Sequence, residues 1–565
     1  MHDLVLRGGL VVDGTGDAPF AGDVAVSGGR VTEVGTVIGR GHTEIDADGH
    51  VVSPGFIDAH THMDAQVFWD ALGTSSCWHG VTSVVMGNCG FTLAPVPPDG
   101  FEAVVRNIER AEDIAAETLA AGVACTWEHF SEYLDVLDSL PKAINYAAYV
   151  GHSAVRTWAM GEQAFEREAT EDDLRLMERE IQDALRAGAI GFSTSRGSHL
   201  TPDGRPVASR VGSWGEVCRL VQSVRSFPSA MVEIAPDLAV RSPDPEVEAQ
   251  WYERLGNLAR SSGVPLTFGV VPTHPTWQHQ LEFLASTTAS GGRLIGQAHS
   301  RGILLVLSFE TQLPFDKLEA WKPIRSLSLA EQRKAFADPE VRARLVESAA
   351  TGAYGAAFGA EARQPNYGAI SVMDSPLPPN PTVAELAAKR GMHPAECMIE
   401  LALENDFKQF FLQPVEPYSS DDILTVMRHP NTVVTFSDAG AHVSQIVDSS
   451  LQTHLIGYWV RERQALTLEE AVRMLTSDIA GTWGLTDRGV LRPGAIADIN
   501  VFDAERVGPR LPTVEHDLPG GGRRLVQRAE GFLATIVGGE VVLRDGEHTG
   551  AFPGRLLRRS SGGVG

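Results

Sequence analysis

Short apolar runs separated by helical segments make up most of the chain. Seven of these runs are continuously apolar, which is typical of buried parallel strands: VTSVVMG, INYAAYVG, AGAIGFSTS, SAMVEIAP, VPLTFGVV, ILLVLSFE and TVVTFSDAG. Between them, residues 171–188 carry an apolar stripe at helical spacing and end in glycine, and residues 467–484 open with a Thr-x-x-Glu capping pattern. With PGFIDAHTH at residues 54–62, eight strands are present. This count predicts an α/β fold, a (β/α)8 TIM-like barrel.

Both ends of the chain have a different pattern, of short strands bounded by glycine or aspartate turns. The segments RGGLVV near the start and VGGEVV near the end are near repeats. We therefore expect residues 1–55 and 481–565 to form one small β-sandwich domain, with the barrel over residues 56–480. A charged helical stretch at residues 321–350 and the loop to residue 379 predict an insertion near 310–379. Segments of this kind often cover the site in barrel enzymes.

Composition narrows the class of protein. The chain has 565 residues, of which 43% are hydrophobic and 21% charged, as expected of a well-buried globular enzyme. A net charge of −25 argues against nucleic acid or an anionic membrane as partner, because both would repel the protein. Five scattered cysteines without a C-x-x-C pair predict no disulfide framework. Neither a signal peptide nor a long apolar span is evident, so we expect a cytoplasmic protein. The expected partner is a small-molecule substrate.

The most informative motif lies where the first barrel strand ends. Side chains alternate along a strand, so His60 and His62 share a face and two imidazoles can hold one divalent metal. The alternative is a pair of ordinary loop histidines. The preceding apolar strand and the flanking Asp58 and Asp64 favour the metal site.

Several motifs together carry a resemblance to a known family. PGFIDAHTH resembles the first-strand motif of the amidohydrolase superfamily, and FSDAGAH places Asp438 where that superfamily has its last-strand aspartate. The segment GLTDRGVLRPGAIADINVFD resembles the superfamily's exit from the barrel into a small β-domain. MGNCGFTLAP, GHSAVR and GAIGFSTS are similar to the N-acyl-D-amino-acid deacylase branch, also called D-aminoacylases. The resemblance implies a barrel fold and a metal-dependent hydrolase.

Two further ligands are expected at strand ends. Asp438 follows the apolar run TVVTFS, where a carboxylate can bind metal and take a proton from metal-bound water. The alternative for Asp438 is a helix N-cap. Cys89 follows VTSVVMG within GNCG, and the resemblance implies that it is a ligand. The alternative for Cys89 is a small buried thiol.

The fifth and sixth strands depart from the deacylase pattern, which has a histidine at the end of each. The fifth strand carries Glu233 near that position, and in the sixth no histidine is in register, since His274 comes a few residues late. Glu233 could replace a histidine as an oxygen ligand. The expected metal ligands are therefore His60, His62, Cys89, Glu233 and Asp438, with zinc as the first choice and iron or manganese as alternatives.

Substrate-contacting residues are expected on the loops above the barrel. His152 and Arg156 are spaced to share one helical face, and the arginine could bind a substrate carboxylate or form a salt bridge at the start of a helix. Further candidates for substrate contact are Ser195, Arg196, His199 and His442. The leading hypothesis is hydrolysis of an amide C–N bond in a small N-acyl amino acid, with Asp438 as the catalytic acid–base. Alternatives are a cyclic-amide or lactone hydrolase and a non-catalytic binding protein.

Overall fold

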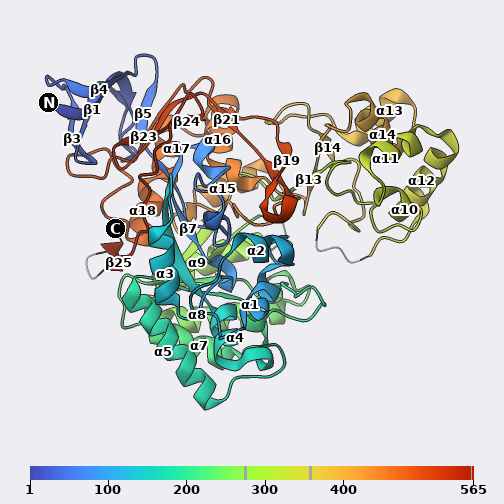
Figure 1. Ribbon diagram of the computed structural model, residues 1–565, viewed down its shortest axis with the longest axis horizontal. Coiled ribbons are helices and arrows are strands. Elements are labelled where there is room, and N and C mark those ends of the chain that lie inside the picture. Colours follow the sequence, from blue (N-terminus) through green and yellow to red (C-terminus); the bar gives the residue numbers. More distant parts are fainter. Residues whose placement is uncertain (273–275, 356–358, 561–562, 565) are drawn as a thin grey trace.

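The computed structural model describes residues 1–272, 276–355, 359–560 and 563–564 (Figure 1). Its centre is a curled sheet of eight parallel strands in sequence order. These are β6 (Phe56–Asp58), β7 (Val81–Met86), β8 (Asn145–Gly151), β9 (Gly191–Ser195), β10 (Met231–Ala235), β11 (Leu266–Gly269), β12 (Leu294–Ala298) and β16 (Thr432–Val434). Most of their residues are buried on both faces, which explains why these strands are continuously apolar. The predicted α/β barrel class is confirmed.

The first and last barrel strands meet through residues just beyond their ends. Asp438 N donates to His60 O at 3.0 Å, and His62 N donates to Ala439 O at 2.7 Å. These two hydrogen bonds close the barrel between β6 and β16. They also bring the His-x-His motif next to Asp438, although nearly the whole barrel separates the two segments in the sequence.

The prediction of the seventh strand is wrong. ILLVLSFE contains β13 (Leu304–Leu307), which pairs antiparallel with β15 (Phe411–Pro414) in a small separate sheet. The seventh barrel strand is β12, which reads LIGQA. Only two of its residues are large and apolar, and its buried Gln297 serves the site described below. A search for continuous apolar runs therefore passes over it.

Helices cover the outside of the barrel (Figure 1). The main ones are α3 (Phe130–Ser139), α4 (His152–Met160), α5 (Glu171–Ala187), α7 (Trp214–Val224), α8 (Pro245–Ser262), α9 (Trp277–Ala289), α15 (Ser420–Met427), α17 (Leu468–Leu475) and α18 (Ser477–Trp483). The prediction for α5 is confirmed, with Thr170 as N-cap and Gly188 at a φ of 118° after its last residue. The predicted helix at 467–484 is divided into α17 and α18 at Thr476. Among the described residues, no helix is long and apolar enough to cross a membrane.

Strands from both ends of the chain lie in one nine-stranded sheet beside the barrel (Figure 1). They are β1 (His2–Val11), β2 (Phe20–Ser27), β3 (Arg30–Gly35), β4 (Gly41–Asp46), β5 (Val51–Pro54), β17 (Ile499–Phe502), β22 (Phe532–Val537), β23 (Glu540–Arg544) and β24 (Glu547–His548). The two ends meet where β5 pairs antiparallel with β17. A separate apolar core, which includes Leu6, Val24 and Ile536, holds this sheet together. The positions of the domain boundaries remain a prediction.

A helical unit projects from the opposite side of the barrel (Figure 1). It begins at β13 and ends at β15, and it includes β14 (Ser371–Val372), which pairs with β15. Its helices are α10 (Lys322–Arg325), α11 (Leu329–Ala337), α12 (Pro339–Thr351), α13 (Val383–Arg390) and α14 (Pro394–Glu404). The unit has its own core, centred on Phe309, Trp321 and Phe336. One contact with the barrel loops is the hydrogen bond from Ala360 N to Gln445 Oε1, at 2.8 Å.

Candidate metal centre and active-site cavity

A cavity of about 220 Å³ lies at the C-terminal ends of the barrel strands, where barrel enzymes carry their active sites. Its polar lining includes His60, His62, Cys89, Glu112, His199, Glu233, Arg241, Gln280, Asp438 and His442. Its apolar lining includes Leu238, Val240, Val271, Ile303 and Phe436. The cavity therefore combines imidazole, thiol and carboxylate groups with an apolar wall.

Four candidate ligand atoms converge at the bottom of the cavity. His60 Nε2 lies 3.7 Å from Cys89 Sγ and 3.5 Å from Asp438 Oδ1, and His62 Nε2 lies 3.0 Å from the same oxygen. One ligand atom each from His60, His62 and Cys89 lie within 4.8 Å of one another. Around a tetrahedral zinc, with bonds of roughly 2.0–2.3 Å, ligand atoms are about 3.3–3.8 Å apart. The donor set and its spacing therefore fit one divalent metal ion.

Two buried side chains orient the histidine rings. His60 Nδ1 donates to Gln297 Oε1 at 2.5 Å, and His62 Nδ1 lies 3.1 Å from Glu112 Oε1. Each partner lies next to the Nδ1 atom of its histidine, so the Nε2 atom of each ring is directed at the candidate metal position. This arrangement is common around metal-binding histidines. The sequence reasoning missed both partners. Gln297 lies on the strand that was not recognised, and Glu112 lies in a charged stretch that reads as an exposed helix.

Burial and neighbouring charges set the protonation of the cluster. Burial lowers the pKa of His60 to about 3, so this ring is neutral and its Nε2 is free to bind metal. Burial also opposes a charge on His62, but Glu112 and Asp438 outweigh it and raise the His62 pKa to about 10. Burial alone would raise the pKa of Asp438, yet the charge of His62 holds it below its usual range. A metal ion held by this cluster would take the place of the proton on His62 as the partner of these carboxylates.

Backbone strain marks the same residues. Cys89, Asp438 and His442 have φ values of 56°, 59° and 49°, in the left-handed region that side chains other than glycine rarely adopt. Such conformations cost energy and persist where the surrounding structure requires them, often at functional sites. The N-cap alternative for Asp438 is not supported, because the next helical residues are Asp448–Ser450.

Glu233 lies beside this cluster, inside β10. Its carboxylate is completely buried, and its Oε2 accepts a hydrogen bond from Cys89 N at 2.6 Å. Its Oε1 has no hydrogen-bond partner among the described residues. Burial raises the Glu233 pKa to about 8. The structure thus puts Glu233 in contact with a candidate ligand, and metal binding by its free oxygen remains a proposal.

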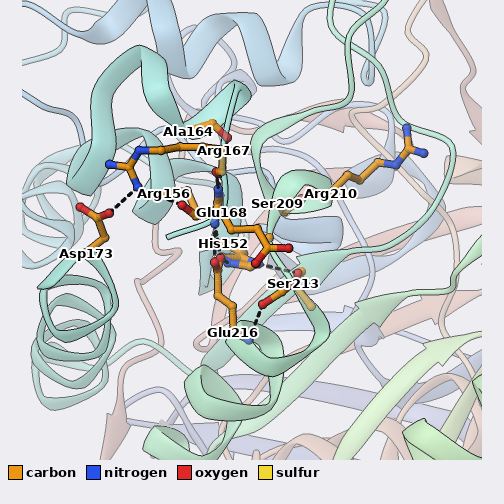
Figure 2. Close-up of polar contacts among 12 residues, drawn as sticks. His152, Arg156, Ala164, Arg167, Glu168, Asp173, Ser209, Arg210, Ser213 and Glu216 are labelled. Carbon is orange, nitrogen blue, oxygen red and sulfur yellow. Dashed lines mark hydrogen bonds and ion pairs between the residues drawn. The ribbon is translucent and has the colours of Figure 1, made fainter. Parts of the chain in front are cut away.

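His152 and Arg156 do not line the cavity, contrary to the predicted substrate contact. They share one face of α4, as predicted, but that face packs against Glu216 of α7 (Figure 2). Arg156 Nη1 donates to both oxygens of Glu216, and His152 Nε2 lies 2.8 Å from Glu216 Oε1. All three side chains are at least 97% buried. The alternative reading, a buried salt bridge, describes this arrangement.

Ser195 and Arg196 are also absent from the cavity lining. Instead, both side chains contact residues of the segment that follows β9. Ser195 Oγ lies 2.7 Å from His199 Nδ1, and Arg196 Nη1 donates to Gly212 O at 2.7 Å. His199 itself lines the cavity, and burial lowers its pKa to about 3. His442 lines the cavity as well, with its Nε2 at 3.7 Å from Asp438 Oδ2. His274 lies outside the described residues.

A (β/α)8 barrel with clustered imidazole, thiol and carboxylate groups at its C-terminal face defines a class, the metal-dependent barrel hydrolases. The chain belongs to the amidohydrolase family, whose profile matches residues 43–543. It is accordingly an enzyme, a hydrolase that acts on C–N bonds other than peptide bonds, and the family uses a divalent metal.

Known relatives match almost the full chain. D-aminoacylase of Alcaligenes xylosoxydans xylosoxydans is 26% identical, over 99% of this chain and 98% of the relative. N-acyl-D-glutamate deacylase of the same organism is 29% identical, over 99% of this chain and 97% of the relative. A solved D-aminoacylase structure, studied for its binuclear metal centre, superposes with a TM-score of 0.65 at 25% identity, over 99% of this chain and all of the other. The predicted resemblance to the deacylase branch is confirmed.

Proposed function

We propose that this protein hydrolyses the amide bond of small N-acyl amino acids, with zinc as its metal. The observation that carries the proposal is the convergence of His60 Nε2, His62 Nε2, Cys89 Sγ and Asp438 Oδ1 at the bottom of the cavity. A mixed nitrogen and sulfur donor set suits zinc better than magnesium or calcium. Relatives named for D-aminoacylase and N-acyl-D-glutamate deacylase activities support the substrate class.

The residues of the chain divide the chemical work among them. When bound, the metal polarises the amide carbonyl and lowers the pKa of water. Asp438 is the proposed acid–base, because its carboxylate reaches both the ligand cluster and the open cavity. It holds a proton at Oδ2, the oxygen on the side away from the ligand cluster, and delivers it to the departing amine nitrogen. His442 lies on the other side of this carboxylate and supports its negative charge.

The substrate carboxylate needs a cation at the mouth of the cavity. We assign this role to Arg241 rather than Arg156, because Arg241 lines the cavity and is exposed, whereas Arg156 is buried against Glu216. A guanidinium can bind a carboxylate through two parallel hydrogen bonds. The apolar residues Leu238, Val240 and Val271 line the same cavity and offer a surface for an acyl chain or an apolar side chain.

Elemental analysis of the purified protein and a substrate screen test this proposal. The screen contains N-acetyl and longer N-acyl amino acids of both configurations, with a cyclic amide and a lactone beside them. We expect zinc in stoichiometric amount and release of free amino acid that stops with a chelator and returns with zinc. Metal-dependent cleavage of the cyclic substrates alone would replace the acyl amino acid with a cyclic amide or lactone. Activity that is insensitive to complete metal removal would refute the proposal.

A further inference from the structure

A second cavity, of about 360 Å³, lies between the barrel and the projecting helical unit. Its polar lining includes Arg301, Ser371, Asn380, Tyr418 and His454, and its apolar lining, mostly proline and leucine, includes Leu304 and Ala369. The short segment after β12 separates it from the active-site cavity, because Ile303 lines the active-site cavity and Leu304 lines this one. It shares no lining residue with the active-site cavity, so the proposed reaction gives it no role.

Arg301 brings a hydrogen-bond donor to this second cavity. Its side chain is 7% exposed, and its Nε and Nη2 donate to Asp448 Oδ1 at 3.3 and 2.8 Å. Nη2 also donates to Val447 O at 3.2 Å. Among the described residues no hydrogen bond is formed by Nη1. The charge of Arg301 is already balanced by Asp448, so what remains is a directed N–H donor rather than an unpaired cation.

His454 brings an acceptor to the same cavity. Ser300 Oγ has one proton, which it donates to the carbonyl of Leu451 at 3.0 Å. The 3.1 Å contact between Ser300 Oγ and His454 Nδ1 therefore has the imidazole as donor. Burial and the nearby charge of Arg301 hold the pKa of His454 well below its usual range, so the ring is neutral. Its proton is on Nδ1, and its Nε2 is a bare acceptor on a side chain that is 3% exposed.

Most of the rest of the wall is apolar. Leucine and proline side chains form the larger part of it, Ser371 and Tyr418 add hydroxyl groups, and the ring of Tyr418 lies against Gly302, where a Cβ atom would collide with the ring. The Asn380 amide is occupied, because its oxygen accepts from Ser375 N and its nitrogen donates to Ser375 O. A ligand for this cavity thus needs an apolar body and one polar edge.

We propose that this cavity binds a small neutral molecule with a cis amide edge, such as a lactam, whose carbonyl accepts from Arg301 Nη1 and whose N–H donates to His454 Nε2. The match is between the Arg301 Nη1 donor and the His454 Nε2 acceptor on the protein and the carbonyl and N–H of the ligand, and the hydroxyls of Ser371 and Tyr418 add two groups that can donate or accept. A carboxylate is disfavoured, because its oxygens would face the lone pair of His454 Nε2 and the charge of Arg301 is already neutralised. A metal ion is disfavoured because the described lining offers one imidazole and no acidic side chain.

The probe is 3,4-dihydro-2(1H)-quinolinone, a lactam fused to a benzene ring, titrated into the full chain by calorimetry. The matched controls are its N-methyl derivative, which lacks the N–H, and 3-phenylpropionate, which replaces the amide with a carboxylate. A fragment of this size is expected to bind at concentrations on the order of 1 mM or below. Each control should bind at least about tenfold more weakly, since each loses one hydrogen bond of the pair.

Two variants and one background locate the binding. His454→Asn keeps a donor for Ser300 but removes the Nε2 acceptor, and Ala369→Leu fills the cavity without touching a polar group. His454→Asn should weaken lactam binding by about tenfold, as expected from one lost hydrogen bond, and Ala369→Leu should weaken it at least as much, because the larger side chain occupies the space of the ligand. Circular dichroism checks that both variants are folded. The Asp438→Asn background prevents turnover of the probe and should leave its affinity unchanged.

Three results would overturn the proposal. The first is no binding at concentrations on the order of 10 mM, far above the affinity expected of such a fragment. The second is unchanged affinity in a folded Ala369→Leu variant, which would put the probe elsewhere. The third is binding that is lost in Asp438→Asn but kept in Ala369→Leu, because the lactam would then occupy the active-site cavity. The test does not depend on the proposed amidase substrate, since binding is measured without turnover.

Discussion

Replacing Gln297 with leucine tests whether the metal site depends on the orientation of His60. Gln297→Leu keeps the approximate size of the side chain and removes the amide oxygen that accepts from His60 Nδ1 at 2.5 Å. The amide nitrogen of Gln297 has no partner among the described residues, so its removal breaks no second contact. The variant therefore isolates a single hydrogen bond.

The magnitude follows from burial. His60 is 1% exposed and Gln297 is fully buried, so the Nδ1–H of the variant has no water to replace its lost acceptor. An unsatisfied buried donor costs about 1–3 kcal/mol. If the holo site carries that cost, metal affinity falls about 5- to 140-fold, since each 1.4 kcal/mol is a factor of ten. This range overlaps the 10- to 100-fold loss, roughly, that is typical for partners of metal-binding histidines.

Zinc affinity is measured by competition with a chromophoric chelator at fixed pH. The control is Thr267→Val on the neighbouring strand β11, because Thr267 is fully buried and its hydroxyl has no partner among the described residues. We expect the control to keep its zinc affinity while Gln297→Leu loses it. Equal affinities in both variants and in the parent protein would refute the idea that Gln297 holds His60 for the metal.

Four further predictions address the site and its surroundings. His60→Ala should lose most of its metal, because one of the two paired imidazole ligands is removed. A full metal content by elemental analysis would show that His60 is not a metal ligand. Asp438→Asn should keep the fold and lower kcat by roughly 10²–10⁴-fold, and near-normal turnover would rule out its acid–base role. Glu216→Ala should lower the unfolding free energy by about 3–5 kcal/mol in urea titrations, because Arg156 becomes an uncompensated buried charge. The metal content of this variant should stay at the parental level, and a loss of metal from the folded variant would show that Glu216 belongs to the metal site. Arg241→Ala should raise KM for N-acyl amino acids about tenfold or more and leave N-acyl amines unaffected, and equal effects on both would exclude carboxylate binding.

Much of the fold follows from the apolar pattern because parallel strands are buried on both faces. Seven of the eight barrel strands lie within predicted runs. The remaining strand, β12, was missed because it carries Gln297 at a position that packing alone would give to an aliphatic residue. ILLVLSFE was chosen in its place because a short buried strand has the same composition in a barrel and in a small antiparallel sheet. An apolar run indicates that a strand is buried, but it does not indicate the sheet to which the strand belongs.

The centre of the site was predictable to the extent that strand ends determine it. His60, His62, Cys89 and Asp438 all follow barrel strands, and such residues converge whatever the loops do. Glu112 lies on a loop far from any strand end, and nothing near it in the sequence indicates that it approaches His62. Arg156 failed as a substrate contact for a related reason. Helical spacing shows which residues share a face, but the partner of that face, Glu216, follows 60 residues later.

The seam that closes the barrel has a consequence for biosynthesis. His60 and Asp438 meet through one backbone hydrogen bond, although they are 378 positions apart in the sequence. At about 5–20 residues per second, a ribosome needs roughly 20–75 s to travel from one to the other. During that interval the nascent chain carries two histidines and a thiol on an open sheet, without the carboxylate that completes the pocket. With the proposed ligand set, metal loading in the final geometry would be a late event, restricted to chains that have been translated beyond residue 439.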